Sequence, residues 1–150
     1  MQQFIFYTTG MIRLTKVFHF ETAHAIYGYD GQCKNIHGHS YELHVTVSGK
    51  LPDTDFIAAP GFLLDFKDIK KAGAEVITLL DHKIVLSEDY VATHPEISTH
   101  ENLEIWPCEP TAENILLYVK RIFDKNLPPD ITPVHLKLYE TKDSYAEWLV

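Results

Sequence analysis

Hydrophobic and polar residues alternate with the period of a β-strand in two segments near the start of the chain. In segment 12–22, Leu14, Phe18 and Phe20 share one face, and His24 continues the same phase just beyond it. Segment 37–47 alternates more cleanly, with one face formed by His37, His39, Tyr41, Leu43, Val45 and Val47. The short connection over 25–36 is rich in turn residues, so the pattern predicts an antiparallel hairpin.

The middle of the chain carries helical spacing in two places. Apolar residues recur at helical intervals over 69–80, and a second stripe runs over 115–123 behind Thr111, a suitable N-cap. Residues 83–109 between them show no clear period, and we interpret them as a long irregular connection. The pattern therefore predicts two helices in the centre of the sequence.

A second pair of strands is predicted at the end of the chain. Residues 133–141 alternate, and Glu140 ends the apolar stripe that contains Leu136 and Leu138. A tight turn at 142–143 leads to a closing strand. The predicted class is α+β, an antiparallel sheet in ββ-αα-ββ order with both helices packed on its apolar face. The polar opposite face and the two open edges predict that copies join edge to edge into a closed barrel.

Size and composition narrow the function. The 150 residues fit one domain over 1–150, and residues 1–11, which precede the first patterned strand, are expected to form an N-terminal extension. A formal net charge of −8 argues against non-specific nucleic-acid binding, so an anionic small molecule would need a locally basic or metal-centred pocket. No apolar run approaches the ~20 residues of a membrane span, and no export signal is visible, so we expect a cytoplasmic protein.

Three histidines are predicted to converge at the end of the first hairpin. Residues two apart on a strand point to the same side, so His37 and His39 can reach one ion, and the hairpin brings His24 beside them. Three imidazoles with an open fourth position are typical of a catalytic zinc site. Two alternatives remain: polar residues at a strand end, or a closed structural site with Cys33 as fourth ligand.

Other residues could carry chemistry at this end of the sheet. Cys33 could act as a nucleophile or base, whereas Cys108 is expected to be a small buried residue. Asp81 could orient His82 for proton transfer, although a favourable histidine at a helix C-terminus is the simpler interpretation. Glu140 could bind an amidine or guanidine edge through two hydrogen bonds, or could be a surface charge.

Six motifs together resemble a known family. They are "ETAH", "CKNIHGH", "GFLLDFKDIK", "LLDHK", "PTAEN" and "LYET", and their order and spacing over residues 12–150 are similar to those of the 6-pyruvoyltetrahydropterin and 6-carboxytetrahydropterin synthases. The resemblance implies the tunnelling fold, in which trimers close a twelve-stranded barrel, two trimers stack into a hexamer, and active sites lie at subunit interfaces.

The resemblance also implies roles for individual residues. It implies zinc ligands (His24, His37, His39), a proton acceptor (Cys33), a proton relay (Asp81, His82, with Glu140 also counted), a pterin anchor (Glu140) and a segment along the pterin (Thr111, Glu113). The triphosphate would meet lysines, for which Lys16, Lys34 and Lys83 are candidates.

The spacing within "CKNIHGH" separates branches of the family. Three residues lie between Cys33 and the first histidine, which is similar to the bacterial 6-carboxytetrahydropterin synthases of queuosine biosynthesis. The implied reaction converts 7,8-dihydroneopterin triphosphate into 6-carboxytetrahydropterin, acetaldehyde and triphosphate. A 6-pyruvoyltetrahydropterin synthase and a non-catalytic pterin-binding protein remain the alternatives, because a fold does not by itself imply an activity.

Overall fold

The computed structural model describes residues 11–52 and 56–150. Apart from Met11, the extension predicted over residues 1–11 lies outside the described residues. Met11 and Ile12 are exposed and lead directly into the first strand.

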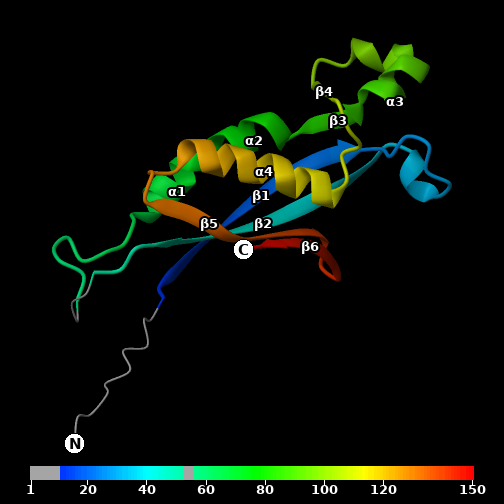
Figure 1. Cartoon of the computed structure of the whole chain (residues 1–150). Coiled ribbons are helices and arrows are strands. Elements are labelled where there is room, and N and C mark those ends of the chain that lie inside the picture. Colours follow the sequence, from blue (N-terminus) through cyan, green and yellow to red (C-terminus); the bar gives the residue numbers. More distant parts are fainter. Residues whose placement is uncertain (1–10, 53–55) are drawn as a thin grey trace, which may run out of the picture.

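The described chain is built on one six-stranded sheet with helices on one side (Figure 1). Its strands are β1 (Arg13–His24), β2 (His37–Gly49), β3 (Lys83–Ser87), β4 (Leu103–Trp106), β5 (Ile131–Thr141) and β6 (Ser144–Leu149), and their spatial order is β4-β3-β1-β2-β5-β6. The pairs β1 with β2 and β5 with β6 are antiparallel, which confirms both predicted hairpins. Strand β5 also pairs with β2, so the two hairpins form one continuous surface.

Helices α1 (Phe66–Ala72), α2 (Ala74–Leu80) and α4 (Ala112–Asn126) cover the apolar face of the sheet, as Figure 1 shows. Asp65 caps the start of α1, since its carboxylate accepts a hydrogen bond from the Lys67 N–H at 2.8 Å. Thr111 caps α4 as predicted, since its hydroxyl accepts from the Asn114 N–H at 3.3 Å. The helix expected over 69–80 is two helices that meet at Gly73.

The core lies between the sheet and these helices. Its fully buried side chains come from alternate positions of β2 and β5 and from one stripe of α4, as the sequence pattern requires; they include Tyr41, Leu43, Val45, Leu136, Leu138, Ile115, Val119 and Phe123. The opposite face carries the predicted polar residues, and some of them form ion pairs with one another. The His44 imidazole lies 2.6 Å from the Glu42 carboxylate, and the Lys137 ammonium lies 3.4 Å from Glu147.

The prediction of an irregular connection over residues 83–109 is wrong. This segment forms β3, α3 (Glu88–Thr93), the 3₁₀-helix η2 (Pro95–Thr99) and β4, and α3 lies at one end of the molecule beyond the two strands (Figure 1). Strand β3 pairs with β1 in parallel, and β4 pairs with β3 in parallel, so the sheet is mixed. A short apolar run such as "KIVLS" has too few residues for its period to reveal a buried strand.

A second, smaller cluster anchors this added segment. Ala25, Leu86 and Tyr90 are buried together, and the Ser87 hydroxyl accepts a hydrogen bond from the Tyr90 N–H at 3.2 Å at the start of α3. Among the described helices, none is long and apolar enough to cross a membrane.

The junction of α1 and α2 generates a stability prediction. A Cβ atom placed on Gly73 would lie 2.6 Å from ring carbons of Phe18 and 2.9 Å from the Phe123 ring. Both rings belong to the core and cannot move away freely. We therefore expect Gly73→Ala to lower the free energy of unfolding by about 1–3 kcal/mol, measured by urea denaturation. Lys70→Ala, on the exposed side of α1, is the control and should change it by less than about 0.5 kcal/mol. Unchanged stability in Gly73→Ala would mean that the rings repack without cost.

Candidate metal centre and adjoining pocket

The pairing of β1 with β2 brings three histidines together. His24 lies opposite His37, and His39 lies opposite Thr22, two residues before His24 on the same face. One nitrogen from each imidazole lies within 4.8 Å of the nitrogens of the other two. The convergence expected from the sequence is therefore confirmed. Cys33 does not belong to this group of possible ligands, so the described residues do not form the closed four-ligand site.

Backbone carbonyl groups orient two of the imidazoles. Nδ1 of His24 lies 2.6 Å from the carbonyl oxygen of Pro110, and Nδ1 of His37 lies 2.8 Å from that of Asn35. A ring nitrogen next to a carbonyl must donate, which leaves Nε2 of each ring with its lone pair directed into the site. This is the arrangement by which proteins fix the tautomer of metal-binding histidines.

The protonation of the group also suits a metal ion. Burial lowers the pKa of His24 and of His39, so these imidazoles favour the neutral form that binds metals. Among the described residues, the buried Nε2 of His39 has no hydrogen-bond partner. A buried nitrogen that makes no hydrogen bond and lies beside two other imidazoles can bind a cation, so the donor set fits a metal.

Glu140 lies beside the histidines, as its position at the end of the apolar stripe of β5 suggested. Its Oε1 lies 3.5 Å from Nε2 of His24 and 3.4 Å from Nε2 of His39. It also accepts a hydrogen bond from the Tyr41 hydroxyl at 3.3 Å. The carboxylate therefore belongs to the site and not to the outer surface.

Tyr41 is a site residue that the sequence reasoning missed. Its side chain is fully buried, and its hydroxyl lies 3.5 Å from Nε2 of His24. Burial, and then the neighbouring Glu140 carboxylate, raise the pKa of Tyr41, so the hydroxyl keeps its proton and donates. The strand alternation could have identified it, because Tyr41 lies on the same face of the strand as His37 and His39.

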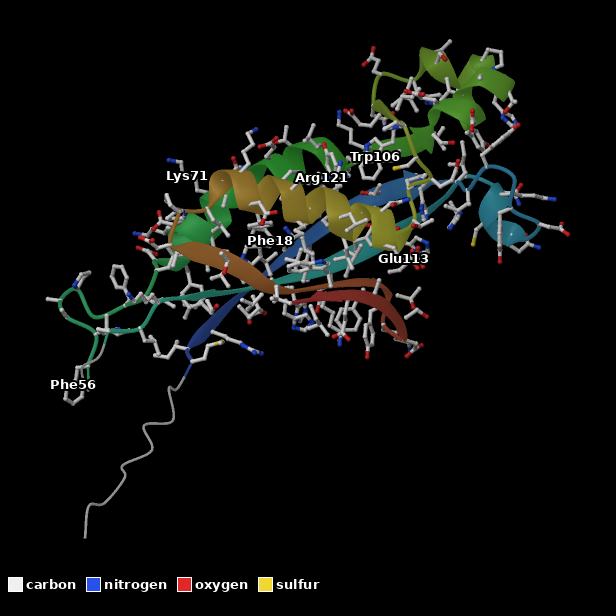
Figure 2. The ribbon with its side chains drawn as sticks, viewed as in Figure 1. Phe18, Phe56, Lys71, Trp106, Glu113 and Arg121 are labelled. Atoms are coloured by element: carbon white, nitrogen blue, oxygen red, sulfur yellow. The ribbon has the colours of Figure 1, made fainter. Side chains whose placement is uncertain are left out.

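A cavity of about 340 Å³ opens beside the metal centre. It is lined by residues from both hairpins and from the start of α4, and they include His24, Tyr29, Cys33, Thr111, Glu113, Glu140 and Tyr145. Cys33 is exposed in a short 3₁₀ turn, η1 (Gln32–Lys34), of the β1–β2 connection. Figure 2 shows Glu113 at the start of α4, and its side chain lines this cavity. The structure therefore brings five of the predicted site residues to one cavity.

Asp81 and His82 form a separate group at the end of α2. The Asp81 carboxylate accepts from the Glu21 N–H at 2.9 Å and lies 2.9 Å from Nδ1 of His82. That backbone hydrogen bond, more than the imidazole, lowers the pKa of Asp81. His82 has a left-handed backbone (φ 58°) and a side chain that is 79% exposed. It lines a second cavity of about 430 Å³ together with His39 and Asn102, so one chain does not place His82 in the cavity of Cys33.

The structure also places the remaining candidates. Lys83 lines the second cavity and forms an ion pair with Glu104 at 3.1 Å, Lys34 follows Cys33 in η1, and Lys16 lies opposite Val45 in the β1–β2 ladder. The three lysines are not brought to one place. Cys108 is exposed, so the prediction of a buried thiol is wrong. It precedes Glu109 between β4 and α4, where the chain runs along the surface.

Comparison with known proteins identifies relatives across nearly the whole chain. Residues 13–149 match the family described as 6-pyruvoyl tetrahydropterin synthase. The 6-carboxy-5,6,7,8-tetrahydropterin synthase of Haemophilus influenzae is 30% identical over an alignment of 144 residues, and the alignment covers 92% of this chain and 99% of that protein. The dihydroneopterin monophosphate aldolase of Pyrococcus furiosus is 30% identical over 128 residues, covering 85% of this chain and 89% of that protein.

The architecture has counterparts among solved structures. The 6-pyruvoyl tetrahydropterin synthase of Caenorhabditis elegans superposes with a TM-score of 0.69 at 19% identity, covering 94% of this chain and 96% of that one. The similarity confirms the α+β tunnelling fold expected from the sequence, with two parallel strands added to the predicted antiparallel ones.

The geometry of the three imidazoles predicts the metal content of two variants. His37→Ala leaves two imidazoles, too few to hold an ion tightly, so we expect the purified variant to lose most of its bound metal. His44→Ala removes a histidine from the same strand but from the opposite face, and should keep the metal. Inductively coupled plasma mass spectrometry on both proteins makes the comparison. Equal metal content in the two variants would place the ion elsewhere.

Proposed function

Because this chain belongs to the 6-pyruvoyl tetrahydropterin synthase family, we propose that it is a zinc-dependent 6-carboxy-5,6,7,8-tetrahydropterin synthase of queuosine biosynthesis. The reaction would convert 7,8-dihydroneopterin triphosphate into 6-carboxytetrahydropterin, acetaldehyde and triphosphate. The observation that carries the proposal is the cavity beside the three-histidine group, which is lined by one of these histidines, His24, and by the accessible thiol of Cys33 and the carboxylate of Glu140. Relatives that bear this enzyme name and align over 99% of their own length support it.

The metal proposed for the three histidines is zinc. Zinc favours three imidazoles with an open fourth position in catalytic sites, and His24, His37 and His39 supply such a set. When bound, it would acidify the side-chain hydroxyls of the substrate and stabilise the charge that develops on them. The carbonyl groups of Pro110 and Asn35 would keep the ligand rings in place as the substrate binds.

The residues of the chain would bind the pterin and move its protons. Cys33, as a thiolate, would accept a proton from the substrate side chain, and its exposure to the cavity allows that contact. The two oxygens of Glu140 would accept hydrogen bonds from the amino-pyrimidine edge of the pterin. Thr111 and Glu113, at the start of α4, would lie along the ring.

The Asp81–His82 pair would complete the site from a second copy of the chain. His82 is exposed in its own cavity and held by Asp81, which suits an imidazole that passes a proton to a substrate bound by another subunit. The sheet ends on β4 and β6, two strands whose outer edges can pair with further copies. In the proposed assembly, three chains close a barrel, and two such barrels stack to form a hexamer.

A second candidate has a specific observation in its favour. The Pyrococcus furiosus relative is named for an aldolase that acts on dihydroneopterin monophosphate. An aldolase of this kind would use the same metal centre and pterin anchor but a different phosphate ester.

The products distinguish the candidates. We expect mass spectrometry to find 6-carboxytetrahydropterin, with acetaldehyde and triphosphate, after incubation with 7,8-dihydroneopterin triphosphate. A pyruvoyl product would identify the other synthase of the family. Turnover of the monophosphate alone would identify the aldolase, and binding without turnover would identify a pterin-binding protein.

The role of the thiol can be separated from metal binding. Cys33→Ala should keep its metal and its melting temperature, because Cys33 lies outside the ligand group, yet lose nearly all turnover. Cys108→Ala is the matched control, since it removes the other exposed thiol and should remain active. A metal-free Cys33→Ala protein would instead make Cys33 a ligand, and a fully active one would remove the thiol from the mechanism.

The unpaired sheet edges predict the oligomeric state. We expect size-exclusion chromatography with light scattering to give the mass of six chains, because edge pairing through β4 and β6 would close a barrel of three chains and two such barrels would stack. Recovery of a stable monomer with full activity would contradict this assembly.

A further inference from the structure

The segment between β4 and α4 contacts both His24 and the loop that carries Cys33. The carbonyl oxygen of Pro110 holds the ring of His24, a metal ligand. One residue earlier, the carboxylate of Glu109 accepts a hydrogen bond from the backbone N–H of Tyr27, at 2.7 Å. Tyr27 belongs to the β1–β2 connection that carries Cys33. Neighbouring residues of one short segment therefore contact the metal ligand and the loop of the thiol.

The loop of Cys33 has few anchors of its own. Most of its residues are exposed, and its hydrogen bonds at Ile26 and Lys34 close within the loop: the Ile26 N–H donates to the Cys33 carbonyl at 2.8 Å, and the Lys34 N–H to the Gly31 carbonyl at 3.2 Å. The hydrogen bond from Tyr27 instead leaves the loop and ends on Glu109. Because Ile26 is adjacent to Tyr27 and donates a hydrogen bond to the Cys33 carbonyl, two hydrogen bonds link the Glu109 carboxylate to the backbone of Cys33.

Glu109 is itself held firmly. Its backbone carbonyl accepts from the Asn114 side-chain amide at 2.8 Å and from the Thr111 N–H at 2.9 Å. Before it, Trp106 is buried at the end of β4 beside α4 (Figure 2), and the centroid of its ring lies 4.6 Å from the centroid of the Tyr118 ring. The segment is thus fixed at both ends, by a strand and by a helix N-terminus, and can serve as a rigid support.

We propose that Glu109 is a positioning residue that fixes the Cys33 loop relative to the metal centre. The proposal rests on the proposed function for the catalytic role of Cys33, whereas the contact itself does not. The side chain acts as a hydrogen-bond acceptor for one backbone N–H, so its oxygen matters more than its charge. An anchor at this point would set the distance between the thiol and a substrate bound at the metal, on which proton transfer depends steeply.

Three variants at position 109 test the proposal. Glu109→Ala removes the acceptor and should lower kcat by about 10- to 100-fold, while KM and metal content stay near the wild-type values because Pro110 still holds His24 through its backbone. Glu109→Gln keeps an oxygen in the same place and should restore kcat. Glu109→Asp keeps the charge but withdraws the oxygen by one methylene, so it should behave like Glu109→Ala. Glu101→Ala removes an exposed carboxylate before β4 and is the control.

Two measurements do not depend on synthase activity. Hydrogen–deuterium exchange of peptides covering residues 25–36 should be faster in Glu109→Ala than in the wild type, and unchanged in Glu109→Gln. In a Cys108→Ser background, the rate at which iodoacetamide alkylates Cys33 should change severalfold in Glu109→Ala alone. If the wild type forms no pterin product, the proposed function fails, and these two measurements still decide the role of Glu109.

Three outcomes would overturn the proposal. They are wild-type kcat in Glu109→Ala, a Glu109→Gln protein as slow as Glu109→Ala, and exchange over residues 25–36 that does not respond to Glu109→Ala. If Glu109→Ala fails to fold, Glu109→Asp takes its place, and wild-type kcat and exchange in that variant would be equally decisive.

Discussion

The register between β1 and β2 is the constraint on which the site depends. It places His24 opposite His37 and puts His39 on the same face, with Tyr41 continuing inward to the core. A slip by one residue would turn the histidines to the other face and expose Leu43 and Val45, so burial of the core and convergence of the three histidines require the same register. Burial of the apolar side chains therefore stabilises the same strand pairing that brings the three imidazoles together.

The two strands added by segment 83–109 give the site its second support. Strand β3 pairs with the last residues of β1, next to His24, and β4 pairs with β3. After β4, the Glu109 side chain contacts the loop of Cys33, the Pro110 carbonyl orients the imidazole of His24, and Thr111 caps α4. One backbone segment, whose path is fixed by a buried tryptophan and a helix cap, thus contacts both His24 and the loop of Cys33.

The groups proposed for catalysis are divided between two cavities. Cys33 and Glu140 line one, and His82 lines the other, while His24 and His39 lie between them on adjacent strands. Each group is held locally: His82 by Asp81 and by the Asn102 side chain, which donates to its carbonyl at 2.9 Å, and Glu140 by Tyr41. A division of this kind suits a site that is completed by pairing of subunits, because each chain presents a preformed half.

The amino-acid sequence determined the elements that are long enough for their hydrophobic pattern to repeat. Strand alternation located both hairpins and the convergence of His24, His37 and His39, and helical spacing with Thr111 located α4. The phase of β5 placed Glu140 on the buried side, because alternation continues past Leu136 and Leu138.

Tertiary structure decided what local pattern cannot encode. Strands β3 and β4 are short, and their parallel partners are distant in sequence, so no period marks them. The division of Cys33 and His82 between cavities and the hydrogen bond from Tyr27 to Glu109 depend on how elements pack across 49 and 82 residues of chain, respectively. Such contacts follow from the three-dimensional path of the backbone, whereas the alternation that built the hairpins is a property of neighbouring residues.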